Sequence, residues 1–313
     1  MAAAMRDAAT QAGTRPSALT GAGIGSPGAV NERTGAVSQA RNLPGWDGTF
    51  RLGTWLTKAL GTPVVVGNDV GVALDAEAHL GVGRAHKSLL GVFWGTGVGG
   101  GVVLGGERWR GRGGAGEIGH TVVKMNGARC TCGRRGCVEA YAGRAAMEIK
   151  ARKERSRGAK TDLFKLMEKH DRDRLTSGIW ARALKHRDPL AERLLDRAVE
   201  ALGAGIASAV NLLDIEAVVI GGGLGSRLGE PYVKKIRKAM APHLFNDDRP
   251  PAMHVAALGD LGGAIGAALL SANHDRSVRA RARARAARAA TRLTPGRDGA
   301  ETSARPTASE TQP

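Results

Sequence analysis

The chain has 313 residues, of which 42% are hydrophobic, 24% charged and only 4% aromatic. These values are ordinary for a globular protein and leave room for two domains. Three cysteines exclude a disulfide framework and favour a reducing compartment, so we expect a cytoplasmic protein. The first residues contain no apolar signal segment, and the apolar stretch at 261–272 is too short to span a bilayer.

The formal net charge of +17 raises the question of a nucleic-acid partner. Residues 274–313 contain nine arginines and four acidic residues, so this Arg- and Ala-rich tail holds +5 of the charge. We expect the tail to be disordered, with at most non-specific binding to nucleic acid or acidic lipid. We therefore predict no membrane association and no specific nucleic-acid partner. The remaining charge would suit a protein that handles anionic phosphates.

Two apolar stretches near the start predict strands that end at a ligand. Residues 18–30 alternate small and apolar residues and break at Pro27, as a strand before a ligand-facing loop would. Residues 62–71 form a β-branched run that stops at Asn68 and Asp69. This pattern predicts a buried strand whose carboxyl end presents both polar side chains, followed by a helix.

The rest of the chain continues the alternation of strands and helices. Residues 88–106 predict two strands joined by a glycine-rich turn, and residues 145–213 are helical in pattern. Within them Asp188 is the expected N-cap of a long helix, with Pro189 at its first position. Residues 215–225 predict another buried strand that enters a glycine loop, and a last strand and a Gly/Ala-rich helix close the fold.

All three cysteines lie within eight positions, at Cys130, Cys132 and Cys137, and His120 precedes the first by ten residues. One imidazole and three thiolates are a ligand set of tetrahedral structural zinc. Three unrelated buried cysteines are an alternative interpretation. A redox pair is another, although the C-x-C spacing lacks the C-x-x-C geometry. Four protein ligands leave no position for water, so we expect the metal to organise a loop.

Two carboxylates flank this cluster. Glu117 lies three residues before His120, and Glu139 lies two residues after Cys137. Either one alone could be a surface acid, but a metal-bound loop would hold both in place. If one ring nitrogen of His120 binds zinc, the other can face a ligand in a fixed tautomer. We therefore expect these residues to form a hydrogen-bonding wall for a molecule rich in hydroxyl groups.

The run GEIGHTVV followed by CTCGRRGCVEAYAG resembles the signature of the ROK family of sugar kinases and sugar-responsive repressors. The motifs GIGSPGAV, NLPGW, PVVVGNDVG, GTGVGGG and VVIGGGLG extend the resemblance in order over roughly residues 18–270. It implies an α/β fold of the actin-like, ribonuclease-H-like type, in which two lobes close over a sugar and ATP. We expect an N-terminal lobe at 1–110, a C-terminal lobe with the zinc loop at 111–273 and the disordered tail at 274–313. The final helix should pack back on the first lobe.

The resemblance implies a hexose kinase, glucokinase above all, in which Asp69 accepts the proton of the sugar 6-hydroxyl as it attacks the γ-phosphate of ATP. Phosphoryl transfer needs such a carboxylate, an oriented hydroxyl and amides around the phosphates. Asn68, Glu117, His120 and Glu139 would contact the sugar, and His120 with the three cysteines would bind Zn²⁺. Mg²⁺ would bind together with ATP. The resemblance to the family also implies a homodimer. The nucleotide would lie on two glycine loops: Gly95, Thr96, Gly97, Gly99, Gly100, Gly101, Gly221, Gly222 and Gly223.

In one respect the chain departs from the family. The family begins with a strand and an Asp-x-Gly-Gly-Thr loop that contacts the phosphates, and this sequence contains no such loop. We therefore expect the first strands of the N-terminal lobe to be missing. Without a helix-turn-helix segment, the repressor branch is disfavoured. Two hypotheses remain: a hexose kinase with a truncated or misassigned start, or a sugar-binding zinc protein without kinase activity. The hexose, and the choice between ATP and polyphosphate as donor, stay open.

Overall fold

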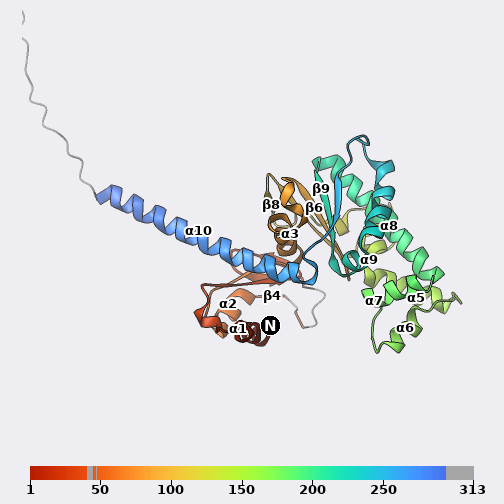
Figure 1. The fold of residues 1–313 in the computed structure, drawn as a ribbon, viewed down its shortest axis with the longest axis horizontal. Coiled ribbons are helices and arrows are strands. Elements are labelled where there is room, and N and C mark those ends of the chain that lie inside the picture. The colour runs from red at the N-terminus through yellow and green to blue at the C-terminus, as the bar shows by residue number, and fades with distance from the viewer. Residues whose placement is uncertain (41–44, 47, 294–313) are drawn as a thin grey trace, which may run out of the picture. The chain divides into compact units, whose positions relative to one another are not determined.

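The computed structural model describes residues 1–40, 45–46 and 48–293, and for residues 278–293 it describes the backbone alone. In this part of the chain, helices and strands alternate as the sequence predicts, and the strands form three sheets (Figure 1). Residues 42–44 of the NLPGW motif lie outside the described residues.

Two small sheets build the first lobe. Val64 and Val66 pack against the apolar face of helix α2 (Leu52–Leu60), because alternate side chains of a strand point to one face. Ser26 lies opposite Asn68, so two parallel strands end side by side. Among the described strands, β1 pairs with β5 alone. The elements are β1 (Ala22–Ser26) with β5 (Val64–Asn68), the antiparallel β2 (Ala29–Asn31), β3 (Ala36–Ser38) and β4 (Thr49–Phe50), and α1 (Ala2–Gln11) packed on α2.

A five-stranded sheet builds the second lobe, and both of its faces are covered. In β9, Val218 and Ile220 face one apolar core, while Ala217 and Val219 face another that contains Leu74 of α3 (Asp69–His79). Burial on both faces is typical of a parallel strand between layers of helices. The strand order is β10 (Ala252–Val255), β9 (Ala217–Gly221), β6 (Leu89–Trp94), β7 (Val98–Leu104) and β8 (Glu107–Trp109).

The structure places the boundary between the lobes earlier than the expected residue 110. Strands β6 to β8 precede that residue, yet β6 pairs in parallel with β9, so residues 89–109 belong to the sheet of the second lobe. Leu89 lies opposite Ala217, and a pairing between such distant residues leaves no local pattern in the sequence.

The helices of the second lobe follow the predicted pattern. Asp188 caps α8 (Pro189–Leu213) by accepting hydrogen bonds from the amides of Leu190 and Ala191 at 3.0 and 2.9 Å. Helices α8 and α9 pack against each other beside the five-stranded sheet (Figure 1). The remaining helices are α4 (Glu139–Ala142), α5 (Arg144–Ser156), α6 (Leu163–Lys169), α7 (Ser177–Lys185) and α9 (Gly222–Met240).

The last helix is longer than the sequence predicts. Helix α10 spans Gly262–Leu293, so residues 274–293, which we expected to be disordered, are helical. Alanine and arginine both have high helix propensity, which favours a helix even where few apolar side chains are present. Residues 294–313 of the expected tail lie outside the described residues. The chain divides into compact units at Met1–Ala272 and Asn273–Pro313.

The start of α10 packs on β1. Gly23 of β1 lies so close to Ala267 that a Cβ at Gly23 would clash with the Ala267 backbone.

In the described part of the chain, no helix combines the length and the apolar character needed to cross a membrane.

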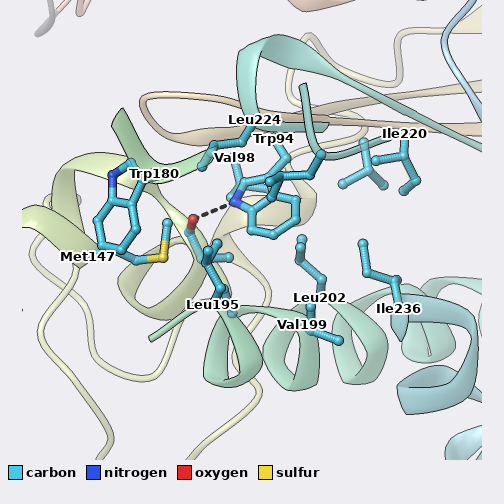
Figure 2. Packing of buried hydrophobic residues seen from close by; sticks show 14 of the residues in the cluster. Trp94, Val98, Met147, Trp180, Leu195, Val199, Leu202, Ile220, Leu224 and Ile236 are labelled. Carbon is cyan, nitrogen blue, oxygen red and sulfur yellow. Dashed lines mark hydrogen bonds between the residues drawn. The ribbon is translucent and has the colours of Figure 1, made fainter. Parts of the chain in front are cut away.

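The largest core lies between the five-stranded sheet and the helices that follow it (Figure 2). Trp94 at the end of β6 is fully buried there, and its indole Nε1 donates a hydrogen bond to the carbonyl of Ala142 at 2.6 Å. Figure 2 shows Leu195, Val199 and Leu202 along the side of α8 that faces this ring. The bond anchors the last residue of β6 directly before the turn that begins at Gly95.

We predict that Trp94→Phe lowers the free energy of unfolding by about 2–4 kcal/mol, because it leaves a cavity and a buried carbonyl without its donor. Denaturant unfolding monitored by circular dichroism measures this change. The matched control is Trp109→Phe, since Trp109 is 49% exposed on the edge strand β8. A loss at position 94 no greater than that at position 109 would contradict the assignment of Trp94 as a core anchor.

Candidate active site

The four predicted metal ligands come together in the structure. The ligand atoms of His120, Cys130, Cys132 and Cys137 all lie within 4.8 Å of one another. The Sγ atoms of Cys132 and Cys137 are 3.8 Å apart, and Nδ1 of His120 is 3.8 Å from Sγ of Cys130. A tetrahedral zinc ion with Zn–S bonds of about 2.3 Å requires sulfur atoms about 3.8 Å apart. The cluster therefore fits a zinc ion.

Backbone bonds shape the loop that holds these ligands. The amide of Cys130 donates to the carbonyl of Arg134 at 2.8 Å, which closes the turn between the first and last cysteines. Gly136 has a φ of +81° and lies against the carbonyl of Lys124, so a side chain there would be strained and would clash. Burial raises the pKa of the Cys130 thiol to about 12, and a bound cation would favour the thiolate instead.

Glu139 connects this metal loop to the turn between β6 and β7. Its Oε1 accepts a hydrogen bond from the Thr131 hydroxyl at 3.0 Å, and its Oε2 accepts one from the amide of Val98 at 3.0 Å. The sequence predicts Glu139 as a sugar contact. The structure shows in addition that both of its oxygens hold protein groups in place.

A cavity of about 580 Å³ lies beside the metal loop, a volume typical of a small-molecule site. Of the predicted sugar contacts, His120 and Glu139 line it, whereas Asn68 and Glu117 do not. The base candidate Asp69 is not among its lining residues either. The cavity lining also includes Pro27, Gly28, Thr96 and Gly97, together with Cys130 and Thr131 of the metal loop itself.

Asn68 and Asp69 make different contacts at the start of α3. Asn68 caps the helix, with its Oδ1 accepting from the amide of Gly71 at 3.0 Å, and its Nδ2 donates to the carbonyl of Gly28 at 3.4 Å. The second bond ties the helix start to the cavity wall. Asp69 is therefore not needed as the cap, and its Oδ1 accepts from the amide of Val70 at 2.9 Å.

The surroundings of Asp69 alter its acidity. Its side chain is accessible to solvent, yet the protein packed around it excludes enough water to raise the pKa of the carboxyl above its ordinary value of 3.8. The bond from the Val70 amide opposes this shift only in part. A carboxylate whose pKa is raised is a better proton acceptor, which suits a general base.

Arg108 of β8 holds α3 from the side, and sequence reasoning did not find it. Its Nη2 lies 2.5 Å from Oε1 of Glu32, and its Nε lies 3.1 Å from Oδ2 of Asp75 in α3. A side chain at Gly71 would collide with the same guanidinium. Glu32 follows β2 of the first lobe, so Arg108 links both lobes to the helix that begins at Asp69. No local pattern could reveal contacts between residues so far apart.

The glycines of the two predicted nucleotide loops fall into different settings. Gly95 and Gly97 form the turn between β6 and β7, whereas Gly99, Gly100 and Gly101 lie inside β7. A Cβ at Gly99 would lie 2.6 Å from Val70, and one at Gly101 would lie 2.8 Å from Leu74, so these positions let α3 approach the strand.

The second predicted loop meets the first. Gly221 ends β9, and Gly222 and Gly223 begin α9. Gly222 has a φ of +78° and packs against the backbone of Trp94, where a Cβ would lie 2.8 Å from its nitrogen. A Cβ at Gly95 would lie 3.9 Å from the amide of Gly223, so the two loops are neighbours.

A second cavity, of about 780 Å³, opens at the start of α9. Gly223 lines it together with Ser177 at the start of α7. Arg144 also lines it, and its Nη2 donates to the Thr96 hydroxyl at 2.6 Å. Thr96 lines the first cavity, so the turn between β6 and β7 lies between the two cavities. An imidazole and a carboxylate line the first cavity, and arginines and the starts of α7 and α9 line the second.

The comparisons with known proteins agree with this geometry. The ROK family model matches residues 1–274. A glucokinase of Thermotoga maritima is 35% identical over 227 residues, 71% of this chain and 69% of the relative. An N-acetylgalactosamine kinase of Shewanella is 32% identical over 270 residues, 82% of this chain and 79% of the relative.

The structural comparison identifies the fold. The crystal structure of a ROK family glucokinase from Streptomyces griseus in complex with glucose and AMPPNP has a TM-score of 0.70 and 32% identity. The match covers 80% of this chain and 81% of that one. The resemblance seen in the sequence and the expected actin-like α/β fold are both confirmed.

We predict that the purified protein contains about one zinc ion per chain and that Cys132→Ser removes most of it, because three ligands hold the ion less well than four. Elemental analysis measures the zinc content. The control Arg134→Ala changes an exposed side chain of the same loop and should keep its zinc. Sugar binding should weaken in Cys132→Ser alone. Wild-type protein with less than about a tenth of an equivalent of zinc would contradict the site.

Proposed function

The chain belongs to the ROK family, and on that premise we propose that it is a kinase that transfers a phosphoryl group from ATP to the 6-hydroxyl of a hexose, glucose in the first place. The observation that carries this proposal is the link between the helix that begins at Asp69 and the first cavity. Asn68 ties its helix to a cavity walled by His120 and Glu139, and a second cavity begins on the far side of the Thr96 turn.

In this proposal the sugar occupies the first cavity, where His120 and Glu139 face its hydroxyl groups. Asp69 binds the 6-hydroxyl and takes its proton while the oxygen attacks the terminal phosphorus. The amides of Gly97 in the turn and of Gly223 at the α9 start surround the phosphates, while the amide of Gly95 closes the turn by donating to the carbonyl of Gly97 at 3.0 Å. Mg²⁺ bound with ATP would neutralise phosphate charge.

The zinc ion would have a structural role. With His120 and three thiolates as ligands, its tetrahedron is full, so it would hold the loop in shape and activate no water. The loop in turn holds Thr131, which donates to Glu139. Loss of the ion would thereby affect the sugar cavity without direct contact with Asp69.

A second candidate function is sugar binding without phosphoryl transfer. Two observations favour it: the sequence contains no Asp-x-Gly-Gly-Thr loop, and β1 has no strand on its second edge among the described residues. The expected loss of the first strands stays a prediction, as do a homodimer and a cytoplasmic location.

A coupled kinase assay with ATP tests the proposed function. The sugars to compare are glucose, mannose, fructose and N-acetylated hexoses, because the cavity wall alone does not select one of them. Turnover of glucose at roughly 1–100 s⁻¹ would be ordinary for a kinase. Sugar binding in calorimetry with no turnover of any of these sugars would favour the second candidate.

We predict that Asp69→Asn lowers kcat by about 10²–10⁴-fold and leaves sugar binding nearly intact, since an amide keeps a hydrogen bond but takes no proton. Asp69 must be ionised to act, and its pKa is raised above 3.8. Protonation of Asp69 should therefore lower kcat/KM of the wild type as the pH falls toward that raised pKa. Kinetics across pH and calorimetry with glucose measure both effects. Turnover within about threefold of the wild type would identify another group as the base.

A further inference from the structure

Arginines gather around the second cavity without protein partners. Arg172, Arg182 and Arg227 line it, and within the described residues their side chains form no hydrogen bond and no ion pair. His170 and one carboxylate, Asp260, lie on the same wall. Like charges collected at a hollow repel one another, so this wall has an unbalanced positive charge in the absence of an anion.

Some surface arginines of the second lobe have acidic partners, whereas others, such as Arg112 and Arg187, have none among the described residues. Arg152 pairs with Glu148 at 2.7 Å, and Arg249 lies 3.7 Å from a carboxylate oxygen of Asp214. Such pairs show that acidic partners are available on this lobe. The cavity arginines have no such partner either, but unlike Arg112 and Arg187 they line one cavity together with Arg144, and this grouping favours an anionic ligand.

Arg144 connects this wall to the turn between the cavities. Its Nη2 donates to Thr96 at 2.6 Å and its Nη1 donates to the carbonyl of Leu175 at 2.9 Å, while its Nε is buried without a partner. The guanidinium therefore lies between the proposed transfer point and the outer cavity. A buried donor without an acceptor is costly unless a ligand satisfies it.

We propose that Arg182 and Arg227, with Arg144 at the inner end, bind the phosphate chain of the phosphoryl donor behind the phosphate that is transferred. This inference rests on the proposed function, which places the sugar in the first cavity. Guanidinium groups bind phosphate oxygens through two parallel charge-assisted hydrogen bonds. The chemistry recognised is a chain of linked phosphates, which ATP and inorganic polyphosphate share.

These arginines act on the leaving side of the reaction. The bond between the terminal phosphorus and its bridging oxygen breaks, and the bond from the sugar oxygen to that phosphorus forms. The hydroxyl proton goes to Asp69, and the electron pair stays on the shortened phosphate chain as added negative charge. The guanidinium groups of Arg182 and Arg227 neutralise that charge.

The test uses Arg182→Met and Arg227→Met, because neither side chain has a protein partner whose loss could unfold the chain. The matched control is Arg33→Met, an exposed arginine that lines neither cavity and whose side chain has no partner among the described residues. Calorimetry measures the binding of AMPPNP, of inorganic tripolyphosphate and of glucose. Kinetics measures the KM of each donor.

Each cavity variant should weaken binding of the phosphate chain by about 10- to 100-fold, and glucose binding and the melting temperature should stay unchanged. Arg33→Met should change nothing. The ligand that binds the wild type and loses affinity in both variants identifies the donor. Loss for AMPPNP indicates a nucleotide donor, and loss for tripolyphosphate indicates an inorganic phosphate chain. A change of less than about twofold, or an equal loss in Arg33→Met, would overturn the proposal.

The outcome separates this proposal from the proposed function. Normal turnover with an unchanged donor KM in both variants would support the kinase and refute the arginine site. Absence of turnover with every donor, together with weakened phosphate-chain binding in the variants alone, would refute the kinase and support the site.

Discussion

The carboxylate of Glu139 holds together the parts on which the candidate site depends. One oxygen accepts the Thr131 hydroxyl of the metal loop, and the other accepts the amide of Val98 after the turn between β6 and β7. A side chain at Gly97 would occupy the place of this carboxylate. Hydrogen bonds to a charged acceptor are stronger than neutral ones, so the metal loop and the turn are coupled in position. The first cavity borders that turn, and Arg144, which lines the second cavity, donates a hydrogen bond to Thr96 of the turn.

Helix α3 provides the second connection. Its first residue is Asp69, and its side is held by Arg108 of β8. Near its other end, the buried carboxylate of Glu77 accepts the amide of Leu258 at 2.8 Å, directly before two residues that line the second cavity. One helix thus ties the candidate base to the wall of the proposed donor site. A displacement of the helix would change both at once.

The glycines of β7 show how packing can resemble a binding motif. The sequence resemblance predicts Gly99 and Gly101 as part of a phosphate loop, and the structure confirms only the turn between two strands at Gly95 and Gly97. The structure places Gly99 and Gly101 in a strand, against Val70 and Leu74 of α3. A glycine required for close approach of a helix and one required for close approach of a phosphate look alike in a sequence.

The sequence by itself determined the features that depend on neighbours along the chain. The strand that ends at Asn68, the cap of α8 by Asp188 and the grouping of three cysteines all follow from local patterns, because capping, burial and turn chemistry act over a few residues. Only the tertiary structure decided which sheet β6 joins, which residues hold α3 and which arginines surround the second cavity. Those contacts join residues that are distant in the chain, and hydrogen bonds and charges across such distances leave no periodic trace in a sequence.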